Sequence, residues 1–104
     1  MAGIYKQIDN NTGSAETVTL ITKGSGTSGN IKKILIANEN TSNAVNVTID
    51  LNDGTNTFTI IKEIEIPVKS SLVLSDNIDF DSNIFNLRIT TSGTGTPTVT
   101  VIIK

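Results

Sequence analysis

The segment Val45-Asn46-Val47-Thr48-Ile49-Asp50-Leu51-Asn52 alternates strictly between apolar and polar side chains. A period of two places all the apolar residues on one face of a β-strand and all the polar residues on the other. The next residues include Asp53-Gly54, a pair that readily adopts the positive φ values of a tight hairpin turn. We therefore predict a half-buried strand over 45–52 that turns back into a partner strand over 57–66.

The alternation breaks in the middle of the partner strand. Lys62 falls on its apolar face and Ile61 falls off it, although the flanking apolar residues share that face: Phe58, Ile60, Ile64 and Ile66. One extra residue in a strand restores the alternation on both sides. We predict a β-bulge near Ile61 and Lys62.

The rest of the chain repeats this pattern of short apolar runs between turns. The 104 residues include 16 Ile, 7 Val and 16 Thr, β-branched types that suit a pleated sheet. We expect further strands over 16–22, 31–38, 68–74, 85–90 and 98–104, with Ile78 and Phe80 turned inward from an acidic loop over 75–84. The chain is thus predicted to be one all-β domain over 1–104, an antiparallel β-sandwich (jelly-roll or Ig-like) of about seven or eight short strands. Residues 1–11 are expected to form a flexible or docking arm.

The composition excludes much chemistry. The chain has no His and no Cys, and so lacks an imidazole base, a thiolate nucleophile and the common ligands of zinc, haem and iron–sulfur clusters. We expect no enzymatic activity, no catalytic residues and no cofactor. A net charge of −2 and 4% aromatic residues argue against a nucleic-acid partner. No apolar run suggests a signal peptide or a membrane span, so we expect synthesis in a cytoplasm without a secretion signal.

The acidic loop offers the one candidate metal site. Residues 79–83 (Asp-Phe-Asp-Ser-Asn) match the opening of an EF-hand calcium loop, but Ile84 stands where that loop needs glycine. An irregular calcium site built from Asp76, Asp79 and Asp81 is the alternative to a solvated acidic turn. We favour the acidic turn.

Three apolar residues are candidates for an interaction surface. Alternation over 98–104 turns Ile102 outward, which indicates either an intersubunit contact or an ordinary exposed residue. The N-terminal segment carries Ile4 and Tyr5. Small β domains without disulfides often bury edges and apolar faces between copies. We take Ile4, Tyr5 and Ile102 as candidate interaction residues.

The order of segments resembles that of small virion proteins of tailed bacteriophages, and the resemblance extends over nearly the whole chain. It includes a Gly/Ser-rich turn at 23–30, and the stretch 64–74 is similar to a motif that reads IPAGSSLVL in such proteins. The other segments that carry it are Thr-Val-Thr-Leu-Ile-Thr at 17–22, Ile-Leu-Ile-Ala-Asn-Glu-Asn at 34–40, Ala-Val-Asn-Val-Thr-Ile at 44–49 and Phe-Asn-Leu-Arg-Ile-Thr-Thr-Ser-Gly at 85–93.

The resemblance implies a structural part of a phage particle. Head decoration (cement) is the first expectation: a homo-oligomer, a trimer, that sits on the capsid surface and binds the major capsid protein or other virion proteins. A tail, neck or fibre-associated module is an alternative within the virion. An attachment β-sandwich that binds carbohydrate or calcium is the alternative from another class.

Overall fold

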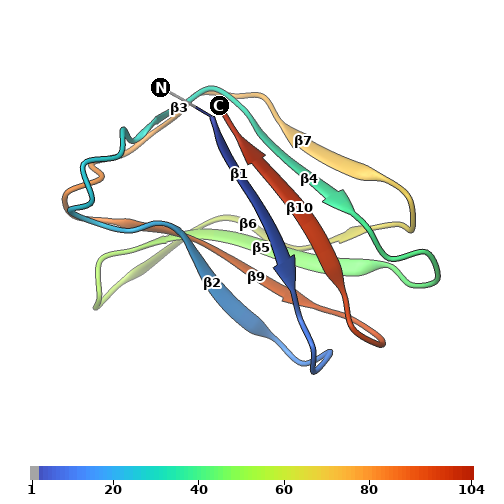
Figure 1. Ribbon diagram of the computed structural model, residues 1–104. Coiled ribbons are helices and arrows are strands. Elements are labelled where there is room, and N and C mark those ends of the chain that lie inside the picture. The colour runs from blue at the N-terminus through green and yellow to red at the C-terminus, as the bar shows by residue number, and fades with distance from the viewer. Residues whose placement is uncertain (1–2) are drawn as a thin grey trace.

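The computed structural model describes residues 3–104, which form ten β-strands and no helix. Eight strands build two four-stranded antiparallel sheets that face each other, as predicted for an antiparallel sandwich (Figure 1). Sheet A contains, in spatial order, β1 (Ile4–Asp9), β10 (Thr98–Ile103), β4 (Ile34–Asn38) and β7 (Ser71–Leu74). Sheet B contains β2 (Glu16–Ile21), β9 (Asn86–Ser92), β5 (Val45–Asn52) and β6 (Thr57–Ile66). A two-stranded ribbon joins β3 (Asn30–Ile31) and β8 (Ile78–Asp79).

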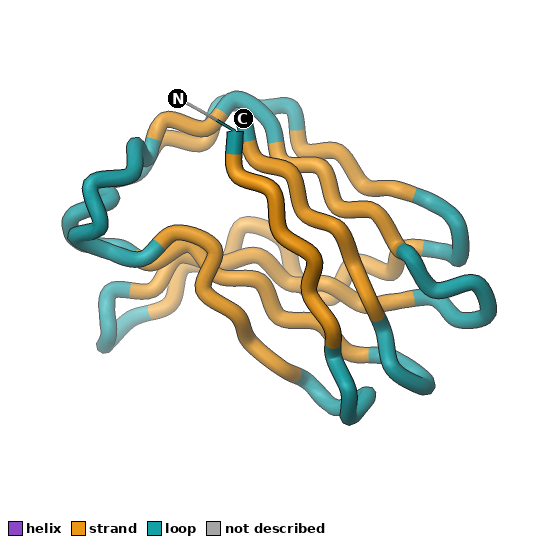
Figure 2. The backbone as a smooth tube through the Cα atoms, in the orientation of Figure 1, coloured by secondary structure: helices purple, strands orange, loops and turns teal. Residues whose placement is uncertain are grey.

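The strand pairing identifies the sandwich as a jelly roll and not an Ig-like fold. The chain forms one long antiparallel hairpin in which β1 pairs with β10, β2 with β9, β3 with β8, β4 with β7 and β5 with β6. This ribbon rolls up on itself, and the contacts of β10 with β4 and of β9 with β5 close the two sheets. A rolled double ribbon of eight strands is the jelly-roll arrangement. The predicted Asp53-Gly54 turn is the tip of the whole ribbon, and Figure 2 shows loops gathered at both ends of the sandwich.

The core lies between the two sheets and consists almost entirely of Ile, Val and Leu. Strand β5 contributes Val45, Val47 and Ile49, each with no exposed surface, as their alternation predicts. Burying an aliphatic side chain of this size contributes about 1.5–3 kcal/mol, so these positions dominate the stability of the sandwich. The other buried apolar residues are Ile8, Leu20, Ile21, Ile31, Ile34, Ile36, Ile66, Leu87, Ile89, Val99, Val101 and Ile103.

Strand β6 contains the predicted bulge. Val47 pairs with Ile64 and Ile49 pairs with Ile61, so two residues of β6 lie opposite Thr48 alone. The second of them, Glu63, has φ of 50°, and its backbone N–H donates to the Thr48 hydroxyl at 2.9 Å. A bulge increases the local twist of an edge strand, which hinders pairing with the edge of another sheet.

Three predicted elements differ in the structure. The predicted strand over 31–38 is two strands, because the backbone N–H groups of Lys32 and Lys33 both donate to the Lys104 carbonyl and turn the chain there. The loop over 75–84 contains β8, and its Ile78 and Phe80 pack against the core as expected. Strand β7 begins only at Ser71, because residues 67–70 form a turn. No helix in the described residues is long and apolar enough to cross a membrane.

Candidate interaction surface

An apolar row crosses the outer face of sheet A, which is the face turned away from sheet B. Tyr5 on β1 pairs with Ile102 on β10, Ile102 with Leu35 on β4, and Leu35 with Val73 on β7. Directly paired residues point to the same side of a sheet, so these four side chains form one continuous line across all four strands. We call this line the apolar row.

The apolar row is open to solvent at both ends. Tyr5 is 63% exposed and Val73 is 47% exposed, whereas Leu35 and Ile102 between them are half-buried. The outer face of sheet B differs, because its paired positions are polar or charged. Its central rows contain Thr17, Thr19, Asn46, Thr48, Asp50, Thr90 and Arg88. Sheet A is therefore the sheet whose outer face offers apolar area to a partner.

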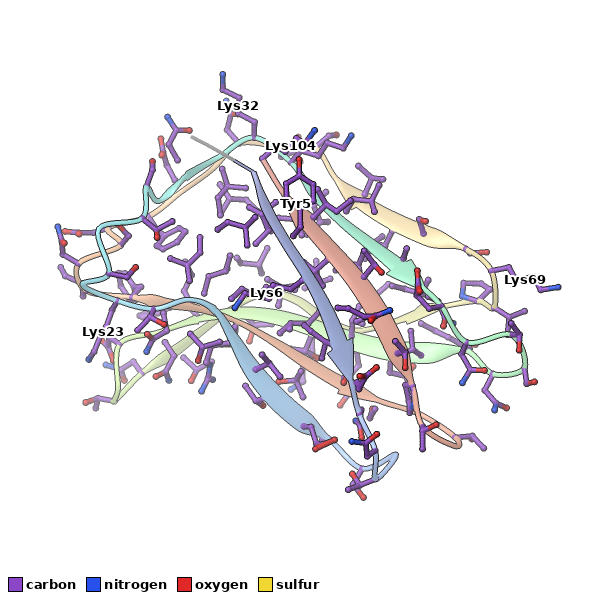
Figure 3. All side chains as sticks on the ribbon, in the orientation of Figure 1. Tyr5, Lys6, Lys23, Lys32, Lys69 and Lys104 are labelled. Carbon is purple, nitrogen blue, oxygen red and sulfur yellow. The ribbon has the colours of Figure 1, made fainter. Side chains whose placement is uncertain are left out.

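A pair of lysines borders the apolar row on one side. Lys33 and Lys104 exchange two backbone hydrogen bonds of 2.9 Å, which extends the pairing of β4 with β10 by one step. The preceding pair, Ile34 and Ile103, is buried in the core, so alternation turns both lysines to the outer face. Figure 3 shows Lys104 and Tyr5 at this same end of the sheet. The single ion pair found within residues 3–104 involves neither lysine.

Carboxylates border the apolar row on its other side. The Glu39 carboxylate accepts hydrogen bonds from Gln7 Nε2 at 3.4 Å and from Thr100 Oγ1 at 3.0 Å. These contacts place it over the residues that follow the apolar row on β1 and β10. Further along, Asp9 Oδ1 accepts a hydrogen bond from Thr98 Oγ1 at 3.0 Å. The outer face of sheet A thus runs from positive charge through the apolar row to negative charge.

Two of the three candidate interaction residues belong to this surface. Tyr5 and Ile102 are direct cross-strand partners in the apolar row. Ile4 pairs with the buried Ile103 and packs against the core, so it lies on the opposite face of β1. Of the expected N-terminal arm, residues 4–9 form β1, and Met1 and Ala2 lie outside the described residues. Whether this segment docks to a partner stays a prediction.

The structure does not bring the three aspartates of the acidic loop together. Asp79 pairs with Asn30 in the β3–β8 ribbon, and Asp81 Oδ1 accepts a hydrogen bond from the backbone N–H of Asn83 at 2.9 Å. No group of three acidic side chains in the described part of the chain is placed to hold a metal ion. Asp76, Asp79 and Asp81 are all exposed.

A shallow hollow lies beside the lysine pair. It encloses about 310 Å³ and is lined by Ser28, Asn30, Lys32 and Lys104. Its lining consists of a hydroxyl, an amide and two lysines. The hollow therefore adds positive charge to this end of sheet A.

Comparisons with known proteins give a likeness of fold only. No family model matches the chain, and no curated protein matches it. A chain in the structure of infectious bursal disease virus, Gx strain, is similar over 96% of this chain, with 14% identity and a TM-score of 0.49. The crystal structure of FLHE is similar over 98% of this chain and 94% of its own, with 10% identity and a TM-score of 0.45. This chain spans 29% of the length of the virus chain.

Proposed function

We propose that the protein is a non-enzymatic structural component of a phage particle, a decoration protein that binds the assembled head and stabilises it. The observation that best supports this is the rolled β-ribbon, since viral capsid domains use the jelly-roll sandwich to present surface. The chain's resemblance to small phage virion proteins points the same way. The absence of His and Cys from the sequence fits a role that needs no reactive side chain.

The proposed mechanism is binding linked to assembly. A protein that binds only the assembled shell stabilises that state by mass action. The stabilising free energy grows with the logarithm of the ratio between the protein's free concentration and its Kd. Each copy contributes a modest contact with the major capsid protein, and repetition over the symmetric shell adds these contacts together. Association of copies with one another would multiply the contacts that each bound assembly makes with the shell.

The glycine-rich loop between β2 and β3 is the proposed contact with the shell. Gly24 and Gly26 have positive φ values, and nothing lies within 4 Å of the position that a Cβ atom would take at either residue. The space around Gly24 and Gly26 is therefore open to a partner, although the Gly24 N–H is held by the Ser82 carbonyl at 2.8 Å. The turn between β9 and β10 lies at the opposite end of the sandwich (Figure 1).

Quantitative mass spectrometry of purified particles tests the proposal. A decoration protein is expected at a copy number comparable with that of the major capsid protein. A much lower copy number would assign it to the tail, neck or fibre, and absence from particles would overturn a virion role altogether.

A pair of loop variants tests the docking site. Ser25→Trp places a bulky side chain in the glycine-rich loop, and Thr94→Trp places one in the exposed turn at the other end. We expect Ser25→Trp to reduce the occupancy of stripped heads at least tenfold and Thr94→Trp to leave it unchanged. Equal occupancy by both variants would show that the glycine-rich loop is not the contact.

A further inference from the structure

We propose that the outer face of sheet A binds the same face of a second copy of this chain, around a two-fold axis that runs along the apolar row. This contact is a property of the free protein and does not depend on the proposed role in a phage head. Its evidence is the charge pattern on either side of the apolar row.

The geometry makes the face complementary to itself. Rotation by half a turn about the apolar row lays each residue of the row on its own counterpart and reverses the strand direction. The lysine side of one copy then covers the carboxylate side of the other. Residues two apart on one face of a strand are separated by about 7 Å along the strand. Lys104 therefore lies about 7 Å from Ile102 in the strand direction.

Glu39 lies at a matching distance on the other side. Its carboxylate is held by Thr100 and Gln7, which are two residues from Ile102 and Tyr5 on their strands. Lys104 and Thr100 belong to the same strand and its extension, so the rotation brings Lys104 of each copy over Glu39 of the other. Lys33 flanks the same contact from β4.

Charge also selects this orientation over the other two-fold arrangement. An axis parallel to the strands would place the lysines of one copy on the lysines of the other. Like charges brought together across an interface cost several kcal/mol, which disfavours that arrangement. In the proposed contact each repulsive Lys33–Lys104 pair instead faces a carboxylate, which offsets the cost of two like charges side by side on neighbouring strands.

The size of the face predicts a weak dimer. Four strands spaced about 4.8 Å apart and about 20 Å long give a flat area of roughly 400 Å² for each copy. Stable interfaces bury about 800 Å² for each partner, so the contact needs a high protein concentration or neighbours that are already held close together. A two-fold contact joins copies in pairs, and a trimer would need a different, head-to-tail surface.

Charge reversal with rescue is the decisive experiment. Sedimentation equilibrium of the full chain at low ionic strength, from micromolar to millimolar concentration, should show a mass rising towards twice 11.0 kDa. Glu39→Lys alone, and Lys33→Glu together with Lys104→Glu, should each weaken association more than about tenfold. An equimolar mixture of the two variants restores opposite charges at both symmetry-related contacts and should associate at least as tightly as the wild type.

Matched variants separate this contact from general charge effects. Glu65→Lys makes the same charge change at an exposed position on β6, in the other sheet, and should leave association unchanged. Ile102→Thr should weaken association while the far-UV circular dichroism spectrum stays that of the wild type. All the charged positions are exposed, so the reversals should fold normally.

Four results would overturn the proposal. They are a wild-type chain that stays monomeric at millimolar concentration, a mixture that fails to associate, a Glu65→Lys variant as weak as Glu39→Lys, and a limiting mass of three copies. A fifth result would show that a different molecule binds the outer face of sheet A. If poly-glutamate shifts the amide resonances of Lys33 and Lys104 while the chain stays monomeric, the face binds an acidic ligand and not a second copy.

Discussion

Arg88 Nε donates a hydrogen bond of 2.7 Å to Asp50 Oδ1, and this ion pair links the two central strands of sheet B on their outer face. The two side chains are unequally exposed, with 27% of Arg88 and 7% of Asp50 open to solvent. A buried charge that loses its partner cannot recover its hydration, whereas a partly exposed one can. Asp50 therefore depends on Arg88 more than Arg88 depends on Asp50.

This asymmetry predicts unequal effects of breaking the pair. Arg88→Met should lower the free energy of unfolding by about 3 kcal/mol, because it leaves the Asp50 carboxylate buried and unpaired. Asp50→Asn should cost only about 1 kcal/mol, since the amide oxygen can still accept from Arg88. Urea denaturation of both variants measures the difference. Equal losses would show that water reaches Asp50 when Arg88 is removed.

A buried asparagine fixes the loop that connects the two sheets after β4. Asn38 is 5% exposed, and its Nδ2 donates to the carbonyl groups of Ile66 at 3.0 Å and Asn43 at 3.1 Å. Its Oδ1 accepts from the backbone N–H of Asn40 at 2.8 Å. This side chain thus satisfies backbone groups of the β4–β5 loop and of the end of β6, which burial would otherwise leave unpaired.

Asn38→Asp should therefore destabilise the protein in a pH-dependent way. The new carboxylate would face carbonyl oxygens, and we expect a loss of about 3 kcal/mol at neutral pH. The folded state raises the pKa of such a carboxyl above its ordinary value. The loss of stability therefore grows as the pH rises above that ordinary value, and it is small in acid. Urea titrations at several pH values measure it. Asn77→Asp, at an exposed position, is the control and should show no such slope.

The predictable part of the fold is the part set by local sequence. Alternation over 45–52 and the Asp53-Gly54 turn predict the tip of the ribbon, and the misplaced Lys62 predicts the bulge. The division of the predicted strand over 31–38 depends on the Lys104 carbonyl, which is far away in the sequence. Strands of two residues, such as β8, are too short to carry a periodic pattern.

The interaction surface was only partly predictable, because it too depends on contacts between residues that are distant in the sequence. Alternation alone indicates that Ile102 points outward, and Tyr5 is one of few aromatic residues. Their adjacency, and the extension of the apolar row through Leu35 to Val73, depend on the register between strands that are distant in the chain. Glu39 becomes part of the surface through its contacts with two other strands. No local pattern contains that information.

The turn before β7 stores backbone strain that a single substitution should release. Lys69 has φ of 57° in the turn closed by the hydrogen bond from Ser70 N–H to the Pro67 carbonyl at 3.2 Å. Side chains with a Cβ atom disfavour this conformation, and glycine adopts it freely. Lys69→Gly relieves this conformation in the folded state but also gives the unfolded chain more conformational entropy. The two effects together should raise the free energy of unfolding by about 0.5–1 kcal/mol. Lys62→Gly, at a position where φ is not positive, should lower the free energy of unfolding by a similar amount. Thermal unfolding of both variants measures the two changes.

The carboxylate of Asp53 holds the tip of the ribbon together, and this gives the last prediction. Its Oδ1 accepts hydrogen bonds from the backbone N–H groups of Asn56 at 2.7 Å and Thr55 at 2.8 Å. These bonds, that of Asn56 first, lower the pKa of Asp53 below its ordinary value of 3.8. A carboxyl whose folded-state pKa is lowered contributes its stabilisation above the ordinary pKa and loses it as the pH falls through the folded value.

Acidification should therefore loosen the turn by protonating Asp53. Asp53→Asn keeps an acceptor oxygen but cannot titrate, so its stability should change less than that of the wild type between neutral pH and a pH below 3.8. Carboxyl ¹³C shifts recorded against pH give the Asp53 midpoint directly, and urea denaturation at the two pH values compares the variants. A midpoint at or above 3.8, or equal acid sensitivity of the two proteins, would mean that the turn is held by its backbone and Gly54 alone, because Gly54 already supplies the positive φ that the turn requires.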